Sequence, residues 1–340
     1  MSLLATFICS SHRPEINGGR LDKSHKPLVE IDYSLSSDIS DEIVNTIAFG
    51  PKQDKVLLSL EHAIEENDKI LIFYYEDLHK KWTYVQNNSD SYFIYRKNDT
   101  EQLKIYPRNL YIRGCQIDRD DPYWMMLGEF YNFVDTWKGR VICAPSKQHN
   151  NESKLYQLNS SLKNSSHPYS DITIGKSYVI KGQNGLTKLS KNKHYIVKSL
   201  SGIRSIVVDE VDFASWNQES LSNIPTLFQE KVAGNDLRIH VVNGKVYGKY
   251  SLEKAGVDYR YDDNFFSLVD FNEVTDELKT FCLAVTEYEG NSLMGIDFIK
   301  SENGYVVLEA NPSPGWSAYH ECNGIEVDAF MKDLLEELTR

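Results

Sequence analysis

The chain has 340 residues, 41% of them hydrophobic and 25% charged, a composition that excludes a disordered or fibrous protein. Because single hydrophobic cores rarely grow beyond roughly 250–300 residues, this length predicts two or three lobes. The formal net charge of −12 argues against a general electrostatic grip on nucleic acid or on an anionic membrane.

Membrane and disulfide signals are both weak. No stretch approaches the ~20 consecutive apolar residues that a membrane span needs, and the apolar start at residues 3–9 lacks a basic flank and a cleavage site. We therefore expect a cytoplasmic protein. The cysteines are odd in number and form no CxxC pair, so we interpret them as reduced, buried thiols: Cys9, Cys115, Cys143, Cys282 and Cys322.

The first third of the chain mixes strand and helix patterns. Short runs of β-branched and aromatic residues predict strands at 69–75, 91–95 and 109–112, and apolar residues at helical spacing predict a helix at 123–137. Together they predict an N-terminal α/β domain over residues 1–145.

A polar stretch at residues 146–170 predicts a hinge, with a short helix from about residue 152. Strand-like runs then predict a small, mostly antiparallel central lobe over 146–223, with strands at 177–180, 194–198 and 205–208.

The third segment predicts a C-terminal lobe over 224–340. Strands are expected at 226–232, 237–242 and 245–250, and Asn243-Gly244 between the last two is a strong hairpin signal. A helix at 273–289, a second hairpin and a final amphipathic helix at 327–338 follow.

The second hairpin, at residues 294–315, is the most informative segment. Its loop 302–304 fits a three-residue turn closed by glycine, which pairs Ser301 with Tyr305. Counting outward places Asp297 opposite Glu309, with Asn311 on the same face. Ile296, Phe298, Val306 and Leu308 are then expected on the opposite, apolar face.

Two carboxylates facing each other across a ladder repel, and a bound metal removes that conflict. Oxygen ligands favour Mg²⁺ or Mn²⁺ over zinc, so Asp297, Glu309 and Asn311 are the predicted metal ligands. The alternative is a solvated sheet face without a ligand. A two-residue turn in place of the three-residue one would put the two acids on opposite faces.

Two further segments offer groups for a nucleotide. Lys198 ends a strand before the small-residue loop 199–202, where backbone N–H groups can approach phosphate. The strand at 226–232 runs into a bend at Gly234, which suits an adenine-binding hinge, with Asp236 near a ribose and Arg238 near phosphates. Taken alone, a solvated lysine and an exposed Asp/Arg hairpin explain these segments equally simply.

The order and spacing of these elements resemble the ATP-grasp superfamily across roughly residues 150–320. The resemblance implies an α+β fold in which two lobes clamp ATP behind an α/β substrate lobe. It implies ATP and Mg²⁺, with two ions, as cofactors. It implies nucleotide contacts from Lys154, Lys198, Ser201, Gly202, Gln229, Glu230, Lys231, Val232 and Asp236, catalytic roles for Lys198, Arg238 and Arg260, and metal ligation by Asp297, Glu309 and Asn311.

Within the superfamily, residues 234–248 (GNDLRIHVVNGKVYG) look most like the ribosomal-protein glutamate ligases and the graspetide macrocyclases, which modify precursor peptides. Residues 107–113 are similar in kind to the substrate-binding lobe of those enzymes. This resemblance implies a ligase that activates a carboxylate as an acyl phosphate and joins it to an amine or a hydroxyl.

Three hypotheses stay open: a peptide or protein ligase, a ligase of small amino acids, and a nucleotide-binding scaffold without turnover. Arg13, Arg20, Arg108 and Arg113 are expected to discriminate between the first two, because an open basic groove favours a peptide and a closed pocket favours a free amino acid. The oligomeric state is left open, with a homodimer as one alternative.

Overall fold

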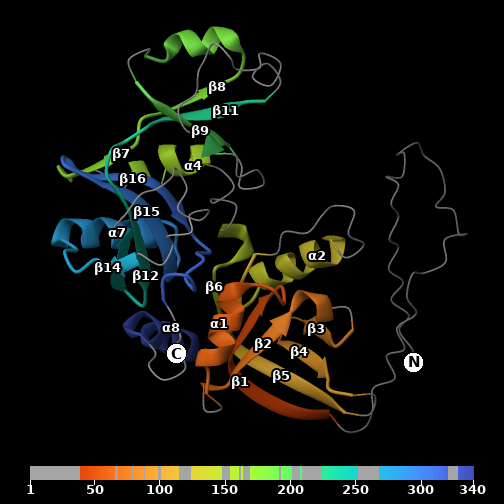
Figure 1. The fold of residues 1–340 in the computed structure, drawn as a ribbon. Helices are drawn as coiled ribbons and strands as arrows, with labels where there is room; N and C mark the ends of the chain where they lie inside the picture. Colours follow the sequence, from red (N-terminus) through yellow and green to blue (C-terminus); the bar gives the residue numbers. More distant parts are fainter. Residues whose placement is uncertain are drawn as a thin grey trace, which may run out of the picture.

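The computed structural model describes residues 39–65, 68–78, 80–87, 89–98, 101–114, 124–147, 154–160, 162–163, 169–190, 193–200, 207–208, 224–251, 268–320 and 328–340. Predicted site residues Ser201, Gly202 and Arg260 lie outside these ranges. The described residues form three β-sheets with helices packed against two of them (Figure 1).

The first sheet builds the N-terminal lobe, with strand order β2-β1-β5-β4-β3 and β6 beside β5. Its strands are β1 (Ile39–Gly50), β2 (Ile70–Tyr74), β3 (Trp82–Gln86), β4 (Ser91–Arg96), β5 (Gln102–Ile112) and β6 (Arg140–Ile142). Helices α1 (Lys55–Ala63) and α2 (Trp124–Asp135) and the short 3₁₀ helix η2 (Tyr75–Asp77) accompany it. Asp54 begins α1 by accepting the Leu57 N–H at 3.0 Å.

The second sheet, at the top of Figure 1, is antiparallel in the order β10-β9-β11-β8. Its strands are β8 (Ser177–Ile180), β9 (Tyr195–Ser199), β10 (Val207–Val208) and β11 (Thr226–Glu230), and the 3₁₀ helix η3 (Gln183–Lys188) follows β8. The sheet has a small core of its own, formed by Ile180, Leu189, Tyr195, Val197 and Phe228.

The third sheet has the order β14-β13-β12-β15-β16-β7. It comprises β7 (Ile172–Ile174), β12 (Asn235–Val242), β13 (Lys245–Ser251), β14 (Leu268–Asp270), β15 (Leu293–Ser301) and β16 (Gly304–Asn311). Helix α7 (Asp276–Tyr288) covers one face with buried Phe281 and Val285, and the short helix α4 (Lys154–Asn159) lies against β16. The predicted hairpin at Asn243-Gly244 is confirmed, with φ of 51° and 70°.

Helix α8 (Ala329–Thr339) joins the first and third sheets. Its Phe330 and Leu334 share one core with Leu57 and Tyr111 of the N-terminal lobe. The C-terminal end of α8 is held by N-terminal-lobe side chains, because Thr46 and Asn109 both donate to the Leu338 carbonyl and Arg140 pairs with buried Glu337. The first and third sheets therefore pack as one body.

Sheet membership differs from the predicted segments at two strands. β11 was expected in the C-terminal segment, yet it pairs with β9 and β8 of the second sheet. β7 lies within the segment predicted as the central lobe, yet it pairs with β16 of the third sheet. The chain thus changes sheet between Ile174 and Ser177 and again between Glu230 and Asn235, and the division into three domains stays a prediction.

Two physical expectations can be compared with the described part of the chain. None of its helices is both long and apolar enough to cross a membrane. Cys143 and Cys282 are buried, reduced cysteines, as expected, and the other three cysteines fall outside the described ranges.

Candidate active site

The turn between β15 and β16 differs from the predicted one. Ser301 pairs with Gly304 across a two-residue loop, so the predicted pairing of Ser301 with Tyr305 is wrong. A register shift between Asp297 and Phe298 leaves Leu308 as the extra residue of a β-bulge. This shift restores the predicted pairing beyond the bulge. Asp297 therefore faces Glu309, as predicted, although for a different reason.

The same turn changes which residues of β16 enter the core. Ile296 and Phe298 are buried against α7, as predicted, but their partners there are Val307 and Ala310. The predicted core positions Val306 and Leu308 are only half-buried, because a two-residue loop inverts the alternation on β16 up to the bulge.

Charged residues form one row across the third sheet. Directly opposite pairs connect Lys249 to Arg238, Arg238 to Asp297, and Asp297 to Glu309. Arg238 Nη1 lies 2.6 Å from Asp297 Oδ2, and Lys154 Nζ forms an ion pair with Glu309. Both carboxylates of the predicted metal site thus have a cationic partner.

Glu309 is held in its ionised form. Burial raises the pKa of this carboxyl, but Lys154, Lys198 and Arg238 outweigh burial and bring the pKa to about 2. The site therefore keeps a carboxylate at neutral pH, which is the form that binds a metal ion or orients a phosphate-binding lysine.

The third predicted metal ligand, Asn311, lies opposite Gly295 and on the same face as Glu309. Its Oδ1 accepts the Ser313 N–H at 2.9 Å. Because an amide oxygen has two lone pairs, this bond orients the side chain and leaves a second acceptor position on the oxygen.

Helix α4 is fastened to β16 by a residue that the sequence analysis did not select. Gln157 is buried, donates to the Ala310 carbonyl at 2.6 Å and accepts the Ala310 N–H at 3.2 Å. Lys154 precedes Gln157 by one helical turn, so the pair of bonds places its ammonium group over Glu309. The only local signal is the i, i+3 spacing, which says nothing about the partner strand.

Lys198 and Gln229 are diagonal neighbours on adjacent strands of the second sheet, because Lys198 pairs with Leu227 and Gln229 with Ile196. Lys198 Nζ donates to Gln229 Oε1 at 2.9 Å, and Gln229 Nε2 donates to Ser177 Oγ at 3.4 Å. The side chain of Gln229 is buried and orients the lysine, and the nucleotide contact that the family resemblance implied for Gln229 stays a prediction.

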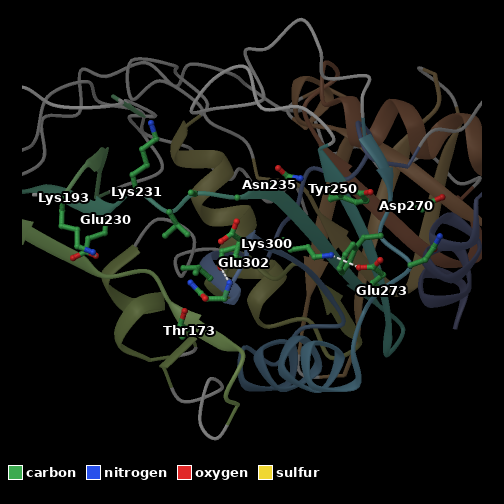
Figure 2. A pocket seen from close by; sticks show the side chains of 18 residues that line it. Thr173, Lys193, Glu230, Lys231, Asn235, Tyr250, Asp270, Glu273, Lys300 and Glu302 are labelled. Carbon is green, nitrogen blue, oxygen red and sulfur yellow. Dashed lines mark hydrogen bonds and ion pairs between the residues drawn. The ribbon is translucent and has the colours of Figure 1, made fainter.

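The hinge between the second and third sheets borders a pocket of about 910 Å³ (Figure 2). Glu230, Lys231 and Val232 line it together with the β15–β16 turn, and Glu230 pairs with Lys193 at 3.4 Å. Of the residues that line this pocket, none is a predicted metal ligand. The hinge residues 230–232 therefore border a pocket that the predicted metal ligands do not line.

Asp236 and Lys249 complete the described surroundings. Asp236 is two residues before Arg238 on β12, hence on the same face. Lys249 forms an ion pair with Asp270 on β14 and was not selected from the sequence. Counting outward from the Asn243-Gly244 turn would have placed it opposite Arg238.

Of the arginines that were expected to discriminate between substrates, the structure describes Arg108 and Arg113, and these two differ in burial. Arg113 is buried, donates to the Ser313 and Pro314 carbonyls at 3.1 and 2.9 Å, and pairs with Asp54 at 3.3 Å. It ties the N-terminal lobe to the loop after Asn311. Arg108 is exposed, and Arg13 and Arg20 lie outside the described ranges.

Comparisons with known proteins agree with this architecture. Residues 180–335 match the model of the RimK-like ATP-grasp domain. A probable alpha-L-glutamate ligase of Histophilus somni (strain 2336) is 28% identical over 142 residues, which cover 39% of this chain and 47% of that protein. One from Haemophilus influenzae (strain Rd) is 25% identical over 149 residues, 42% and 49% of the two chains. The chain thus matches about half the length of these relatives.

Two solved structures are similar over most of the chain. A Chryseobacterium gregarium RiPP-associated ATP-grasp ligase, in complex with ADP and a leader and core peptide, has a TM-score of 0.68 at 16% identity, covering 87% of this chain and 96% of its own. The macrocyclase MdnC of Microcystis aeruginosa MRC, bound with precursor peptide MdnA, has a TM-score of 0.65 at 14% identity, covering 87% and 99%.

The class of protein follows from the three sheets and these similarities: the chain has the ATP-grasp fold. More particularly, residues 180–335 are similar to the RimK-like ATP-grasp domain. The predicted resemblance to glutamate ligases and peptide macrocyclases of this superfamily is confirmed.

Proposed function

We propose that the protein is an ADP-forming ligase that uses Mg-ATP to activate a carboxylate of a peptide or protein and joins it to an amine or a hydroxyl. The observation that carries the proposal is the ionised Glu309 opposite Asp297, surrounded by Lys154, Lys198 and Arg238. A half-buried carboxylate pair with three cations around it supplies the groups that phosphoryl transfer from Mg-ATP requires, which favours a ligase over a scaffold without turnover.

The residues present fit a magnesium site. Asp297 and Glu309 offer carboxylate oxygens and Asn311 an amide oxygen, the hard donors that Mg²⁺ prefers alongside waters and phosphate oxygens. Among the described residues no group of three His, Cys, Asp or Glu side chains converges, so the set is two carboxylates and one amide. The bound ions would neutralise charge on the phosphates of ATP.

Binding of nucleotide would release the two ion pairs. Lys154 turns from Glu309 toward the phosphates, next to Lys198, which Gln229 already orients. The backbone at residues 230–232 reads the adenine and Asp236 the ribose. Ser201, Gly202 and Arg260 keep the phosphate-facing roles implied by the family resemblance.

The first chemical step forms the acyl phosphate. A substrate carboxylate oxygen attacks the γ-phosphorus, the bond to the β,γ-bridging oxygen breaks, and ADP leaves. Lys249 and Arg238, adjacent on the sheet face, hold the anionic substrate and stabilise the negative charge on the transferring group.

The second step forms the product. The amine or hydroxyl of the acceptor attacks the carbonyl carbon of the acyl phosphate, inorganic phosphate leaves, and the acceptor loses one proton. The proposed mechanism requires no covalent nucleophile from the protein. Its contribution is to hold the reacting groups together and to exclude water from the acyl phosphate.

A peptide is favoured as the substrate because the similar structures of the Chryseobacterium gregarium ligase and of MdnC are both complexes with peptides. The glutamate ligase relatives favour a second candidate, in which free glutamate is the acceptor. Two alternatives accompany the proposal. In one the carboxylate substrate is a small molecule, and in the other the protein is a homodimer.

The test is a substrate screen with Mg-ATP, in which ADP release is measured and product masses are determined. Peptides encoded beside the gene are supplied in one set of reactions and pooled free amino acids in the other. A peptide that loses the mass of water, or gains an amino acid, with one ADP per bond supports the proposal. Turnover with the amino-acid pool alone would replace the peptide substrate by a small molecule.

A further inference from the structure

The guanidinium of Arg238 lies across the neighbouring strand at Gly295. A Cβ at residue 295 would lie 2.5 Å from Arg238 Nη2, 2.8 Å from its Cζ and 2.7 Å from Pro314 Cβ. No side chain fits there, so glycine in the segment Met294-Gly295-Ile296 is what allows the arginine to lie flat beside Asp297.

A chain of buried hydrogen bonds leads away from this guanidinium. Arg238 Nε is 3.3 Å from His240 Nε2, His240 Nδ1 is 3.0 Å from His320 Nε2, and His320 Nδ1 is 2.8 Å from Asp328 Oδ2. Both imidazoles are fully buried. The other oxygen of Asp328 accepts the Met331 N–H at 2.8 Å and so caps α8.

The donor and the acceptor of each hydrogen bond in this series follow from Arg238, where the series begins. A guanidinium only donates, so Nε2 of His240 must accept and its proton must be on Nδ1. That proton is donated to Nε2 of His320, whose own proton on Nδ1 goes to the Asp328 carboxylate. Each donor then has one acceptor, as buried polar groups require.

The surroundings keep His240 neutral, as this arrangement demands. Burial first, and then the positive charge of Arg238, lower the pKa of His240 well below its usual value, and the Gly315 carbonyl opposes this shift only in part. His320 stacks on Phe330 with ring centroids 3.9 Å apart, so the second ring cannot rotate freely.

We infer that His240, held by His320 and Asp328, is a positioning residue that sets the plane of the Arg238 guanidinium toward the γ-phosphate. The bond at Nη1 to Asp297 is one of the two ion pairs that nucleotide binding releases, so the bond at Nε to His240 is the one that keeps this plane. A preoriented donor stabilises developing charge without reorganising during the reaction. The inference rests on the proposed function, in which Arg238 contacts the transferring phosphoryl group.

The experiment compares nucleotides with and without a γ-phosphate. In His240→Phe, which keeps the ring volume but removes both nitrogens, we expect the affinity for the Mg²⁺ complex of the non-hydrolysable β,γ-imido analogue of ATP to fall about 10-fold. The affinity for Mg-ADP should change less than about 2-fold, and kcat should fall roughly 10–100-fold. Calorimetric titration and ADP release measure these quantities.

Matched variants separate positioning from packing. His240→Gln retains an acceptor for Arg238 Nε and should recover part of the lost affinity. In an Arg238→Lys background, which lacks the planar fork, His240→Phe should cost little more, because the interaction that it removes is already absent.

Three results would overturn the inference. One is an equal loss of affinity for both nucleotides together with a lower melting temperature, which indicates a structural role. Another is wild-type discrimination between the nucleotides in His240→Phe. If His240→Phe does not fold, the deciding variant is His320→Phe, which keeps the stacking on Phe330. A selective loss of affinity for the nucleotide with a γ-phosphate in His320→Phe supports the inference, and the absence of that loss overturns it. A wild-type protein that binds neither nucleotide contradicts the proposed function itself, and the inference with it.

Discussion

At the scale of single residues, the balance of charge at Glu309 determines the proposed chemistry. The carboxyl is removed from water, which favours its neutral form, yet three cations keep it ionised. Asp297 opposite it is neutralised by Arg238. Since each acid has its own basic partner, the site is stable before ligands bind and can exchange those partners for a metal ion and phosphates.

Glu309→Gln is expected to lower the rate of ADP release by at least about 100-fold, while the protein stays folded. The amide retains the shape of the side chain but offers no anionic ligand. ADP release and a thermal melt test this, and Glu273→Gln is the matched control, because Glu273 is an exposed acid paired with Lys300. Normal ADP release in Glu309→Gln would remove this residue from the metal site.

The pH dependence of stability follows from the same residue. The pKa of Glu309 is about 2 when folded and 4.5 for the free side chain, so its contribution to stability is present above about pH 4.5 and is lost as the pH falls toward 2. Denaturant unfolding at about pH 6 and about pH 3 should show a larger loss of stability for the wild type than for Glu309→Gln. Equal losses would show that Glu309 is not preferentially ionised in the folded state.

Lys249 gives a prediction about the substrate. In Lys249→Gln the KM for the carboxylate substrate should rise about 10-fold, because one cation next to Arg238 is lost, whereas ADP affinity should be unchanged. Lys245→Gln, on the same strand and paired with Asp333, is the control. A reduced ADP affinity in Lys249→Gln would place this lysine at the nucleotide instead.

At the scale of elements, the short helix α4 and the hairpin β15–β16 form one unit. Gln157 bonds both backbone groups of Ala310, so the residue between Glu309 and Asn311 is fixed by a helix that also carries Lys154. The β-bulge beside Leu308 turns Glu309 toward the site. Helix, bulge and ligand residues thus determine one another's positions.

Gln157→Ala should detach α4 from β16. Two buried backbone groups lose their partners, which costs about 1–3 kcal/mol of stability, and the misplaced Lys154 should weaken Mg-ADP binding about 10-fold. Calorimetry and chemical denaturation measure both effects. Asn159→Ala, on an exposed position of the same helix, is expected to behave as wild type, and equal behaviour of the two variants would exclude the proposed coupling.

Local patterns predicted the elements well and their contacts less well. The hairpin at Asn243-Gly244, α7 and α8 were predicted within a few residues because turn chemistry and apolar spacing are local. The facing of Asp297 and Glu309 was predicted through an incorrect turn that the bulge compensates, and no pattern in β16 announces a bulge. Gln157 and the His240–His320 contact join residues 153 and 80 positions apart, which no local pattern predicts.

At the scale of the whole molecule, the lobes differ in how they are joined. The first and third sheets share a core through α8, whereas the second sheet has its own small core and is connected to the third by the segments after Ile174 and after Glu230. Clamping a nucleotide between them requires motion of a separately packed lobe, and this division of cores allows it.

Core substitutions should reveal these two bodies. Leu334→Ala, in the shared core, is expected to cost about 2–5 kcal/mol and to raise amide exchange in both the first and third sheets. Val197→Ala should raise exchange in β8, β9 and β11 alone. Hydrogen exchange followed by mass spectrometry measures this, and a uniform rise in exchange for Val197→Ala would mean that all three sheets unfold as one unit.

The central claim, that a carboxylate is activated as an acyl phosphate, is tested most directly by oxygen transfer. The substrate that first supports ADP release is labelled with ¹⁸O in its carboxyl group, and the inorganic phosphate is analysed by mass spectrometry. We predict one ¹⁸O atom in phosphate for each ADP formed. Phosphate without the label, at full product yield, would contradict the account, because the carboxylate oxygen would then never have been bonded to phosphorus.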